Sequence, residues 1–218
     1  MAAVSRTGEG QMDEFVLVVG TKRYSTWSLR PYMALRHAGA TFQEEEVTLR
    51  QPDTKAQILA HSPSGKVPLL IHNGLKVWDS LAICEYVAEL FPEAGLWPAE
   101  RDARAVARAV SAEMHAGFQA LRQVMPMDIS LHAPMSGIPP EVQADIDRVT
   151  AIWRDCRARF GQGGPFLFGR FTIADAMYAP VVSRFTTYGV GVDDVSAAYM
   201  QAIWDLPAMR DWAAAATA

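Results

Sequence analysis

The sequence predicts a mixed α/β domain followed by an all-helical domain. Three observations support this: strand-like and helix-like patterns alternate up to residue 91, a Pro- and Gly-containing stretch follows, and only helical patterns appear beyond it. We assign residues 1–13 to a flexible tail, 14–91 to the α/β domain and 99–218 to the helical domain. A chain of 218 residues is long enough to bury two cores.

The first four elements follow from the spacing of apolar residues. Phe15–Val19 is apolar and β-branched, as a buried strand would be, and Ser28–His37 has apolar residues at helical spacing. Gly39 ends this helix, and Thr41–Leu49 alternates apolar residues with glutamates, which is typical of a half-exposed strand. A shorter helix is expected over Asp53–Ala60.

A hairpin and a helix complete the first domain. The apolar runs Val67–Ile71 and Leu75–Trp78 are separated by a turn that contains Asn73 and Gly74, a strong signal for a β-hairpin. The segment Asp79–Leu90 places its apolar residues on one helical face. The predicted order is therefore βαβαββα.

The second half shows helical patterns and no convincing strand pattern. Helical spacing is found over Val106–Leu121, over Val142–Phe160, from Thr172 onward, and in the shorter segments Asp193–Trp204 and Pro207–Ala215. The segment Met125–Pro140 lacks periodicity and is rich in Pro, Met and Gly, so we expect a mobile loop there.

Composition argues against several functions. The 24 acidic and 20 basic residues give a net charge of -4 and form no basic block, so nucleic acid is not an expected partner. No apolar run approaches the roughly 20 residues of a membrane helix. The two cysteines, Cys84 and Cys156, cannot form a disulfide framework, which favours a cytoplasmic location, and both fall on apolar helix faces where we expect core residues.

Three hydroxyls, those of Ser25, Thr26 and Ser28, lie between the first strand and the first helix. Ser28 or Ser25 is a candidate for the N-cap of that helix. The unpaired N–H groups and the dipole of a helix N-terminus also favour an anion, and a hydroxyl donor there would stabilise a thiolate. Spacing alone does not choose between a cap and an anion site.

Pro68 stands at the second position of an apolar strand, where it removes a backbone donor, so this strand lies at an edge or begins here. A cis bond between Val67 and Pro68 would turn the backbone groups of Val67 outward, toward a peptide-like ligand. An ordinary proline at a strand entrance is the alternative.

Two more polar pairs occur at helix starts. Asp79 and Ser80 could bind the amino and carboxylate groups of an amino acid, although ordinary capping explains them equally well. Thr172 and Asp175 have the spacing of a capping box, with Asp in place of the usual Glu, and we expect Asp175 to be a buried structural carboxylate.

In this order and spacing, these segments resemble the cytosolic glutathione transferases over nearly the whole chain from Phe15 onward. The loop Ser25–Arg30 is similar to the serine-type active-site loop, and is nearest to the pattern Ser-Ser-Cys-Ser-x-Arg of zeta-like bacterial members. The other matching segments are Gly65–Pro68, similar to the Val-Pro element, Asp79-Ser80, similar to the pair that holds the γ-glutamyl end, and Thr172–Asp175, similar to the capping box of the helical domain. The resemblance implies a thioredoxin-like first domain, a homodimer, and glutathione as co-substrate without a metal.

The resemblance also implies residue roles. Ser25 would donate a hydrogen bond to the glutathione sulfur and stabilise the thiolate, with Thr26 as the second candidate. Lowering a thiol pKa of about 8.5 by two units requires about 2.7 kcal/mol, which a hydrogen bond and a helix dipole can supply. The expected glutathione-binding residues are Ser25, Thr26, Trp27, Lys66, Val67, Pro68, Asp79 and Ser80. Trp27 occupies the position of the zeta cysteine, which excludes cysteine chemistry there.

A pocket for the electrophile is expected in the first helices of the second domain, with His115, Phe118, Arg122 and Met125 as candidates and ordinary helix packing as the alternative. Zeta-type maleylacetoacetate isomerases have a basic residue late in the helix that follows the capping box. Thr187 stands at that position here. Arg184 lies one turn earlier and could substitute, although a solvated or ion-paired arginine is the more ordinary expectation.

The resulting hypothesis is a glutathione transferase in which bound thiolate attacks a small electrophile. One alternative is a glutathione-dependent cis-trans isomerase of the maleylacetoacetate isomerase type. The other is a non-catalytic member of the fold that acts through protein partners.

Overall fold

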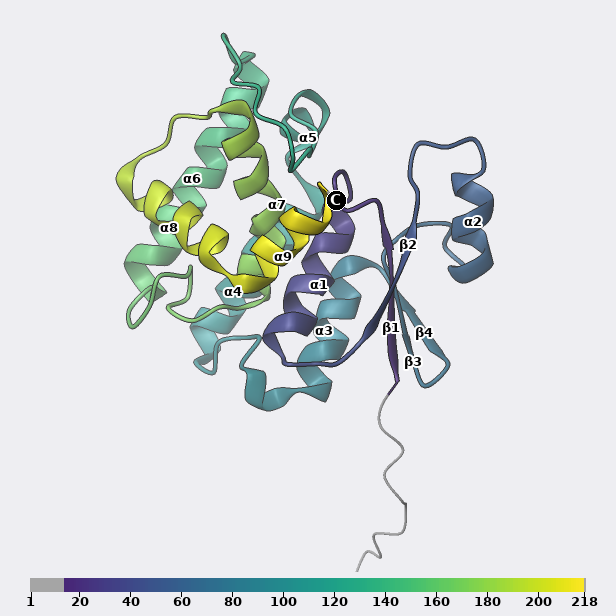
Figure 1. The fold of residues 1–218 in the computed structure, drawn as a ribbon. Helices are drawn as coiled ribbons and strands as arrows, with labels where there is room; N and C mark the ends of the chain where they lie inside the picture. Colours follow the sequence, from purple (N-terminus) through teal and green to yellow (C-terminus); the bar gives the residue numbers. More distant parts are fainter. Residues whose placement is uncertain (1–13, 218) are drawn as a thin grey trace, which may run out of the picture.

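The structure, a computed structural model, describes residues 14–217 and consists of a four-stranded sheet with helices beside it and a larger helical half (Figure 1). The predicted tail, residues 1–13, lies outside the described residues. The strands are β1 (Phe15–Gly20), β2 (Gln43–Val47), β3 (Leu69–His72) and β4 (Leu75–Trp78), in the spatial order β2-β1-β3-β4.

The sheet is mixed, because β1 pairs in parallel with β2 and antiparallel with β3. The predicted hairpin joins β3 to β4, with Leu69 opposite Trp78. Asn73 and Gly74 in its turn have φ angles of 48° and 84°, and a tight hairpin turn of this kind needs positive φ at both central positions. The Asn-Gly signal in the sequence therefore has a direct structural cause.

The two faces of the sheet bury different residues, because successive side chains of a strand point to opposite sides. Leu17 and Val19 belong to the main core, together with residues of α1 (Thr26–His37) and α3 (Ser80–Leu90). Val18, between them, joins a smaller cluster that includes Ile58 of α2 (Thr54–His61). α1 and α3 thus lie on one side of the sheet and α2 on the other (Figure 1).

The second half is helical, as predicted. After a 3-10 turn, Pro92–Ala94, it consists of α4 (Arg101–Ala116), α5 (Gln119–Val124), α6 (Pro140–Phe160), α7 (Ile173–Tyr188), α8 (Asp194–Asp205) and α9 (Pro207–Ala215). α7 is buried along most of its length and packs against α1, so the same core cluster extends through both halves. Within residues 14–217, no helix is both long and apolar enough to span a membrane.

One sequence-based expectation about the second half is wrong, and another stays a prediction. The helical pattern over Val106–Leu121 is not one helix: α4 ends at Ala116, and Phe118 adopts a left-handed φ of 62° before α5 begins. Residues 125–139 contain no helix or strand, as expected of a loop, and their mobility stays a prediction. Backbone hydrogen bonds join this segment to other elements. Ala133 N–H donates to Thr187 O at 2.8 Å, and Ile129 N–H donates to Arg23 O at 3.2 Å.

The last helix returns to the first domain. Trp212 Nε1 donates to the backbone oxygen of Lys22 at 2.9 Å, and Arg36 of α1 pairs with Asp211 at 2.6 Å. These contacts connect α9 to the loop before α1 and to the last turn of α1.

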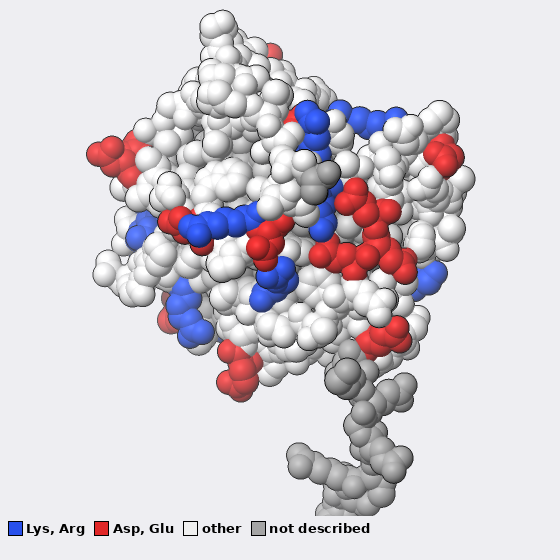
Figure 2. All heavy atoms as spheres, viewed as in Figure 1, with Lys and Arg blue, Asp and Glu red and all other residues white. Residues whose placement is uncertain are grey.

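Charges of both signs are interspersed on the face shown in Figure 2, with a group of acidic side chains where β2 lies in Figure 1. β2 contains Glu44, Glu45 and Glu46, and all three are exposed. This face offers no broad basic surface.

Candidate functional site

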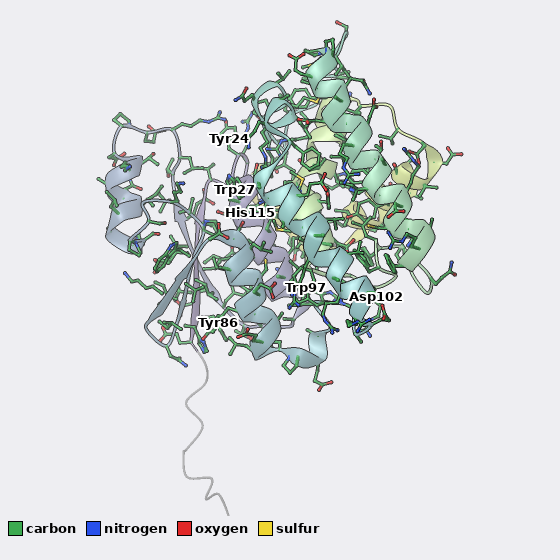
Figure 3. All side chains as sticks on the ribbon, turned by 180° about the vertical axis from the view of Figure 1, so that it is seen from behind. Tyr24, Trp27, Tyr86, Trp97, Asp102 and His115 are labelled. Atoms are coloured by element: carbon green, nitrogen blue, oxygen red, sulfur yellow. The ribbon has the colours of Figure 1, made fainter. Side chains whose placement is uncertain are left out.

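A cleft of about 690 Å³ lies between the first domain and α4. Its lining comes from the start of α1, the segment before β3, the junction of β4 with α3, and α4. The lining residues are Trp27, Ile58, Ser64, Gly65, Lys66, Val67, Pro68, Trp78, Asp79, Ser80 and His115. Six of the eight residues expected to bind glutathione are among them, and Figure 3 labels Trp27 and His115 near one another beside α4.

The peptide bond between Val67 and Pro68 is cis, as the resemblance implies. Pro68 precedes the first residue of β3, Leu69, so its missing N–H removes no bond from the strand ladder. Within the described part of the chain, no backbone hydrogen bond involves Val67. The N–H and C=O of Val67 are therefore available at the wall of the cleft.

Asp79 is the N-cap of α3, and its carboxylate has two roles. Oδ1 accepts hydrogen bonds from the N–H groups of Leu81 at 2.9 Å and Ala82 at 3.3 Å. Oδ2 lies 3.3 Å from Nε2 of His115 on α4. The hydroxyl of Ser80 is buried and has no hydrogen-bond partner among the described residues. Capping therefore involves one carboxylate oxygen, while a free hydroxyl lies at the same helix end.

Ser25 occupies the N-cap position of α1, which begins at Thr26 and not at Ser28, but neither serine forms the expected side-chain cap. Ser25 Oγ donates instead to Ser28 Oγ at 2.7 Å, and Ser28 Oγ also accepts from Gly20 N–H at 3.1 Å. Ser25 and Thr26 are only 5% and 6% exposed. Neither is among the residues that line the cleft.

Within residues 14–217, Arg184 is neither solvated nor ion-paired, contrary to the sequence-based expectation. It is buried, and it donates to Thr26 Oγ1 at 2.9 Å and to the backbone oxygen of Met125 at 2.8 Å. Burial lowers the pKa of Arg184 to about 10. Thr187 is also buried, with its hydroxyl bonded to Asp128 O at 3.0 Å.

Of the four candidates for the electrophile pocket, only His115 lines the cleft. Its ring meets the indole of Trp27 edge-on, with 5.2 Å between centroids, and burial is the main cause that lowers its pKa. Phe118 and Met125 are buried in the main core and do not line the cleft. Arg122 donates to Gly117 O at 2.9 Å and places its guanidinium over Trp27.

The comparisons with known proteins agree with this geometry. The model of the glutathione S-transferase N-terminal domain matches residues 24–90, and the model of the C-terminal domain matches residues 139–215. The chain belongs to the glutathione S-transferase family. The predicted thioredoxin-like domain followed by a helical domain is therefore confirmed.

Individual relatives of this glutathione S-transferase family member match only part of the chain. A probable maleylacetoacetate isomerase of Caenorhabditis elegans is 31% identical over 99 residues, which are 45% of each chain. A probable glutathione S-transferase of Solanum tuberosum is 35% identical over 89 residues, 39% of each chain. The chain thus spans less than half the length of these curated relatives.

The fold also matches solved structures. A glutathione transferase homolog from Burkholderia gl BGR1 with bound glutathione has a TM-score of 0.69 at 22% identity, covering 94% of this chain and 98% of that one. A Tau class glutathione S-transferase from Mangifera indica has a TM-score of 0.68 at 20% identity, covering 91% of each chain.

Sequence reasoning about the family loop missed the state of Arg30. Its side chain is completely buried, and Nε, Nη1 and Nη2 have no hydrogen-bond partner among the described residues. Its guanidinium lies 4.3 Å from the ring centroid of Trp27. Burial, together with the nearby Arg122 and Arg184, lowers its pKa to about 9. The sequence shows only that Arg30 lies within the segment Ser28–His37, whose apolar residues have helical spacing.

The two cysteines and the capping box, which the sequence analysis also singled out, lie in the interior and not at the cleft. Cys84 and Cys156 are free and buried, and burial raises the pKa of each thiol to about 12. The capping box is present: Asp175 Oδ2 accepts from Thr172 N–H at 2.7 Å, and Oδ1 accepts from Leu167 N–H at 3.1 Å. Residues 14–217 contain no group of acidic, His or Cys side chains that could hold a metal ion.

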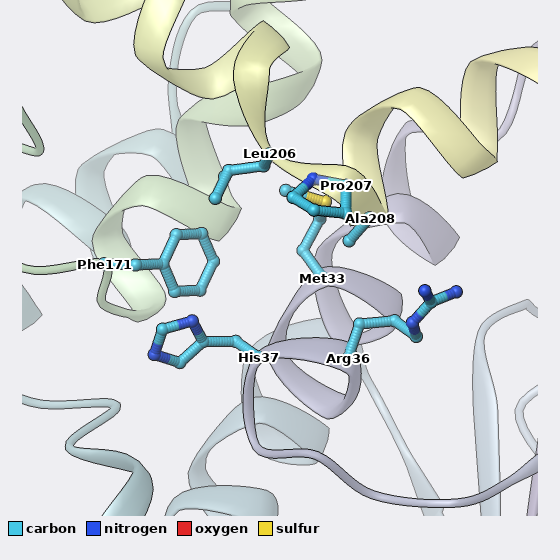
Figure 4. Close-up of a pocket in the computed structure, with 7 residues that line it drawn as sticks. All are labelled: Met33, Arg36, His37, Phe171, Leu206, Pro207 and Ala208. Atoms are coloured by element: carbon cyan, nitrogen blue, oxygen red, sulfur yellow. The ribbon is translucent and has the colours of Figure 1, made fainter.

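A second cavity, of about 220 Å³, lies between the end of α1, the residue before the capping box and the start of α9 (Figure 4). Met33, His37 and Phe171 line it, and the rings of His37 and Phe171 are 4.5 Å apart. None of the expected glutathione-binding residues reaches this cavity, so it is separate from the family's site.

Proposed function

We propose that the protein is a glutathione transferase, which binds glutathione in the 690 Å³ cleft and activates its thiol for attack on a small electrophile. The main supporting observation is that Val67-Pro68, Asp79-Ser80 and Trp27 come from three separate segments and line one cleft. The glutathione bound in the similar Burkholderia structure also supports this ligand.

The cleft suits the functional groups of this tripeptide. The N–H and C=O of Val67 can pair with the cysteinyl backbone, as a strand edge pairs with an added peptide. Ser80 and the N-terminus of α3 can receive the γ-glutamyl carboxylate, and Asp79 can accept from the γ-glutamyl amino group. Lys66 lines the cleft and is exposed, so its ammonium can bind the remaining carboxylate.

Ser25 is our first candidate for stabilising the thiolate. Its hydroxyl now donates to Ser28 Oγ, but both are hydroxyls and this bond can reverse. With Ser28 as the donor, the proton of Ser25 becomes free for an anion at the start of α1. Gly20 N–H, which donates to Ser28 Oγ, would strengthen such a chain of hydrogen bonds.

Thr26 is the second candidate. Its Oγ1 accepts from the charged Arg184, which leaves the hydroxyl proton free and makes it a better donor. Rotation of either side chain toward the cleft would bring a donor to the sulfur, so the two residues require direct comparison.

The decisive experiment measures glutathione binding and ionisation in parallel. We expect the protein to be retained on immobilised glutathione and to show thiolate ultraviolet absorbance at neutral pH. Ser25→Ala should still bind but raise the pKa of the bound thiol and lower kcat/KM about 10- to 100-fold, the loss expected for one charge-assisted hydrogen bond.

Thr26→Val serves as the matched variant. If it abolishes the thiolate absorbance while Ser25→Ala leaves it intact, Thr26 has the role. A folded wild-type protein that shows no retention would contradict the proposed function itself.

A glutathione-dependent isomerase remains the second candidate because one relative is named a probable maleylacetoacetate isomerase. Arg184 does not line the cleft and Thr187 is buried, so neither offers a charge to a substrate there. Assays of cis-dienoic acids beside a panel of electrophiles, both with glutathione, will separate the two activities.

We further propose a cytoplasmic homodimer. Two free buried cysteines suit a reducing compartment. Leu75 on the edge strand β4 is 53% exposed, and a sheet edge with an exposed apolar side chain is a surface that a second subunit can cover. Sedimentation analysis should give twice the mass of 23.9 kDa; a single subunit mass at micromolar concentration would contradict the dimer.

A further inference from the structure

His115 of α4 lies against the carboxylate to which we assign the γ-glutamyl amino group, so this inference rests on the proposed function. Nε2 of His115 is 3.3 Å from Oδ2 of Asp79. The other oxygen of this carboxylate, Oδ1, caps α3 by accepting from the N–H groups of Leu81 and Ala82. Each oxygen of Asp79 therefore has its own neighbour, one within α3 and the other on the helical half of the molecule.

The surroundings of His115 indicate where its ring carries a proton. Burial is the main cause that lowers its pKa; Asp79 opposes this effect, while Arg30 and Arg122 add to it. The ring is therefore mainly neutral at pH 7. Nδ1 is buried without a hydrogen-bond partner among the described residues, and a proton there would be a buried donor without an acceptor. The single proton of the neutral ring belongs on Nε2, which faces Asp79.

Contacts with other elements hold the imidazole in place. Its ring meets the indole of Trp27 edge-on, with 5.2 Å between centroids (Figure 3). The guanidinium of Arg122 lies 4.9 Å from the centroid of the same indole, and it donates to the backbone oxygen of Gly117, directly after α4. His115 itself belongs to the last turn of α4. The ring thus connects α4 to the start of α1 and to the N-cap of α3.

A neutral neighbour suits a carboxylate that has to bind an ammonium group. Within residues 14–217, the carboxylate of Asp79 forms no ion pair with a lysine or arginine, and its side chain is 46% exposed. A fixed positive charge in the place of His115 would cancel the negative charge that attracts the ligand. The imidazole occupies one lone pair of Oδ2 and leaves the other, together with the charge, for the amino group.

We propose that His115 is a positioning residue for glutathione: it holds the carboxylate of Asp79 in the orientation that receives the γ-glutamyl amino group. This role acts through Asp79, so it concerns ligands that carry the amino group. The electrophile pocket, for which the sequence offers His115 as a candidate, would use the same ring for a different ligand. The two roles predict different kinetic effects.

The test compares glutathione with glutaryl-cysteinylglycine, an analogue that lacks only the γ-glutamyl amino group. Calorimetric titration of the full-length protein gives the Kd of each ligand. His115→Leu removes the contact with Asp79, and we expect glutathione binding to weaken about 3- to 10-fold, the usual loss for one hydrogen bond. Binding of the analogue should change less than about twofold, because its complex contains no group for Asp79 to hold.

Two further variants make the comparison specific. His115→Gln, whose amide can donate to Asp79, should recover most of the affinity for glutathione. His132→Leu is the matched control, because His132 is exposed and does not line the cleft, and both Kd values should stay as in the wild-type protein. In steady-state kinetics, the loss in His115→Leu should appear in the KM for glutathione and not in the KM for the electrophile.

The wild-type protein gives a result that does not depend on the folding of a variant. Nitrogen-15 NMR at pH 7 should show His115 as the neutral tautomer with its proton on Nε2. A proton on Nδ1, equal weakening of both ligands by His115→Leu, or a change confined to the KM for the electrophile would overturn this inference and leave the proposed function intact. A folded wild-type protein that binds neither ligand would overturn both.

Discussion

Ser28 connects the end of β1 to the start of α1 through one hydroxyl. Its Oγ accepts from Gly20 N–H and from Ser25, and the side chain is fully buried. Ser28→Ala would leave the Gly20 N–H buried without an acceptor. We expect a loss of about 1–3 kcal/mol in the free energy of unfolding, measured by urea denaturation.

Ser130→Ala provides the control for this substitution. Ser130 also forms a side-chain hydrogen bond, to Asp128, but it is exposed, so its loss should change stability by no more than about 0.5 kcal/mol. If the two substitutions lowered the free energy of unfolding equally, the hydrogen bond from Gly20 to Ser28 would contribute no more to stability than an exposed one.

Single residues also show what the sequence could and could not predict. Pro68 was placed correctly because the constraint is local: a proline at a strand entrance has few possible environments. The surroundings of Arg184 and Arg30 were not predictable, because both depend on helices far apart in the chain. Arg184 bonds to Thr26 across 158 residues, and a helical pattern gives no information about such a contact.

At the scale of elements, the start of α7 determines a pH dependence. Burial raises the pKa of Asp175 to about 6, whereas an unfolded aspartate has a pKa of about 3.9. The folded state therefore binds this proton more tightly. The resulting stability is fully present below about pH 4 and is lost as the pH rises through 6.

We therefore expect Asp175→Asn to be more destabilising at pH 5 than at pH 7.5, by about 1–1.5 kcal/mol in the free energy of unfolding. Asp193→Asn is the matched control, because Asp193 also caps a helix, α8. Desolvation raises the pKa of Asp193, but its hydrogen bonds with Ser196 and Arg154 outweigh this effect and lower the pKa to about 2. Its effect should be the same at both pH values. A constant effect of Asp175→Asn would mean that Asp175 does not titrate in this pH range.

Helix and strand boundaries were predicted well where caps and turns are local. The hairpin turn at Asn73-Gly74 and the capping box at Thr172 follow from short-range chemistry. The break at Phe118 was missed, because apolar spacing continues through it into α5. The attachment of residues 125–140 was missed as well, since its backbone partners lie near Arg23 and Thr187.

At the scale of the whole molecule, one core cluster joins both family domains. Met33 on α1 and Phe185 on α7 both belong to it and are almost fully buried. We expect a single unfolding transition, with tryptophan fluorescence and far-ultraviolet circular dichroism changing together. Met33→Ala should lower the free energy of unfolding by about 2–5 kcal/mol, and both signals should report the same loss. Two separated transitions would show that the domains unfold independently.

The hydrogen bond from Trp212 to Lys22 affects the order in which the protein can mature during synthesis. Lys22 lies three positions before Ser25, yet its backbone oxygen is bound by a side chain 190 residues later. A ribosome-bound chain must therefore release α9 before this loop acquires its final contact. The proposed thiolate site, although encoded early, is completed only after α9 has been synthesised.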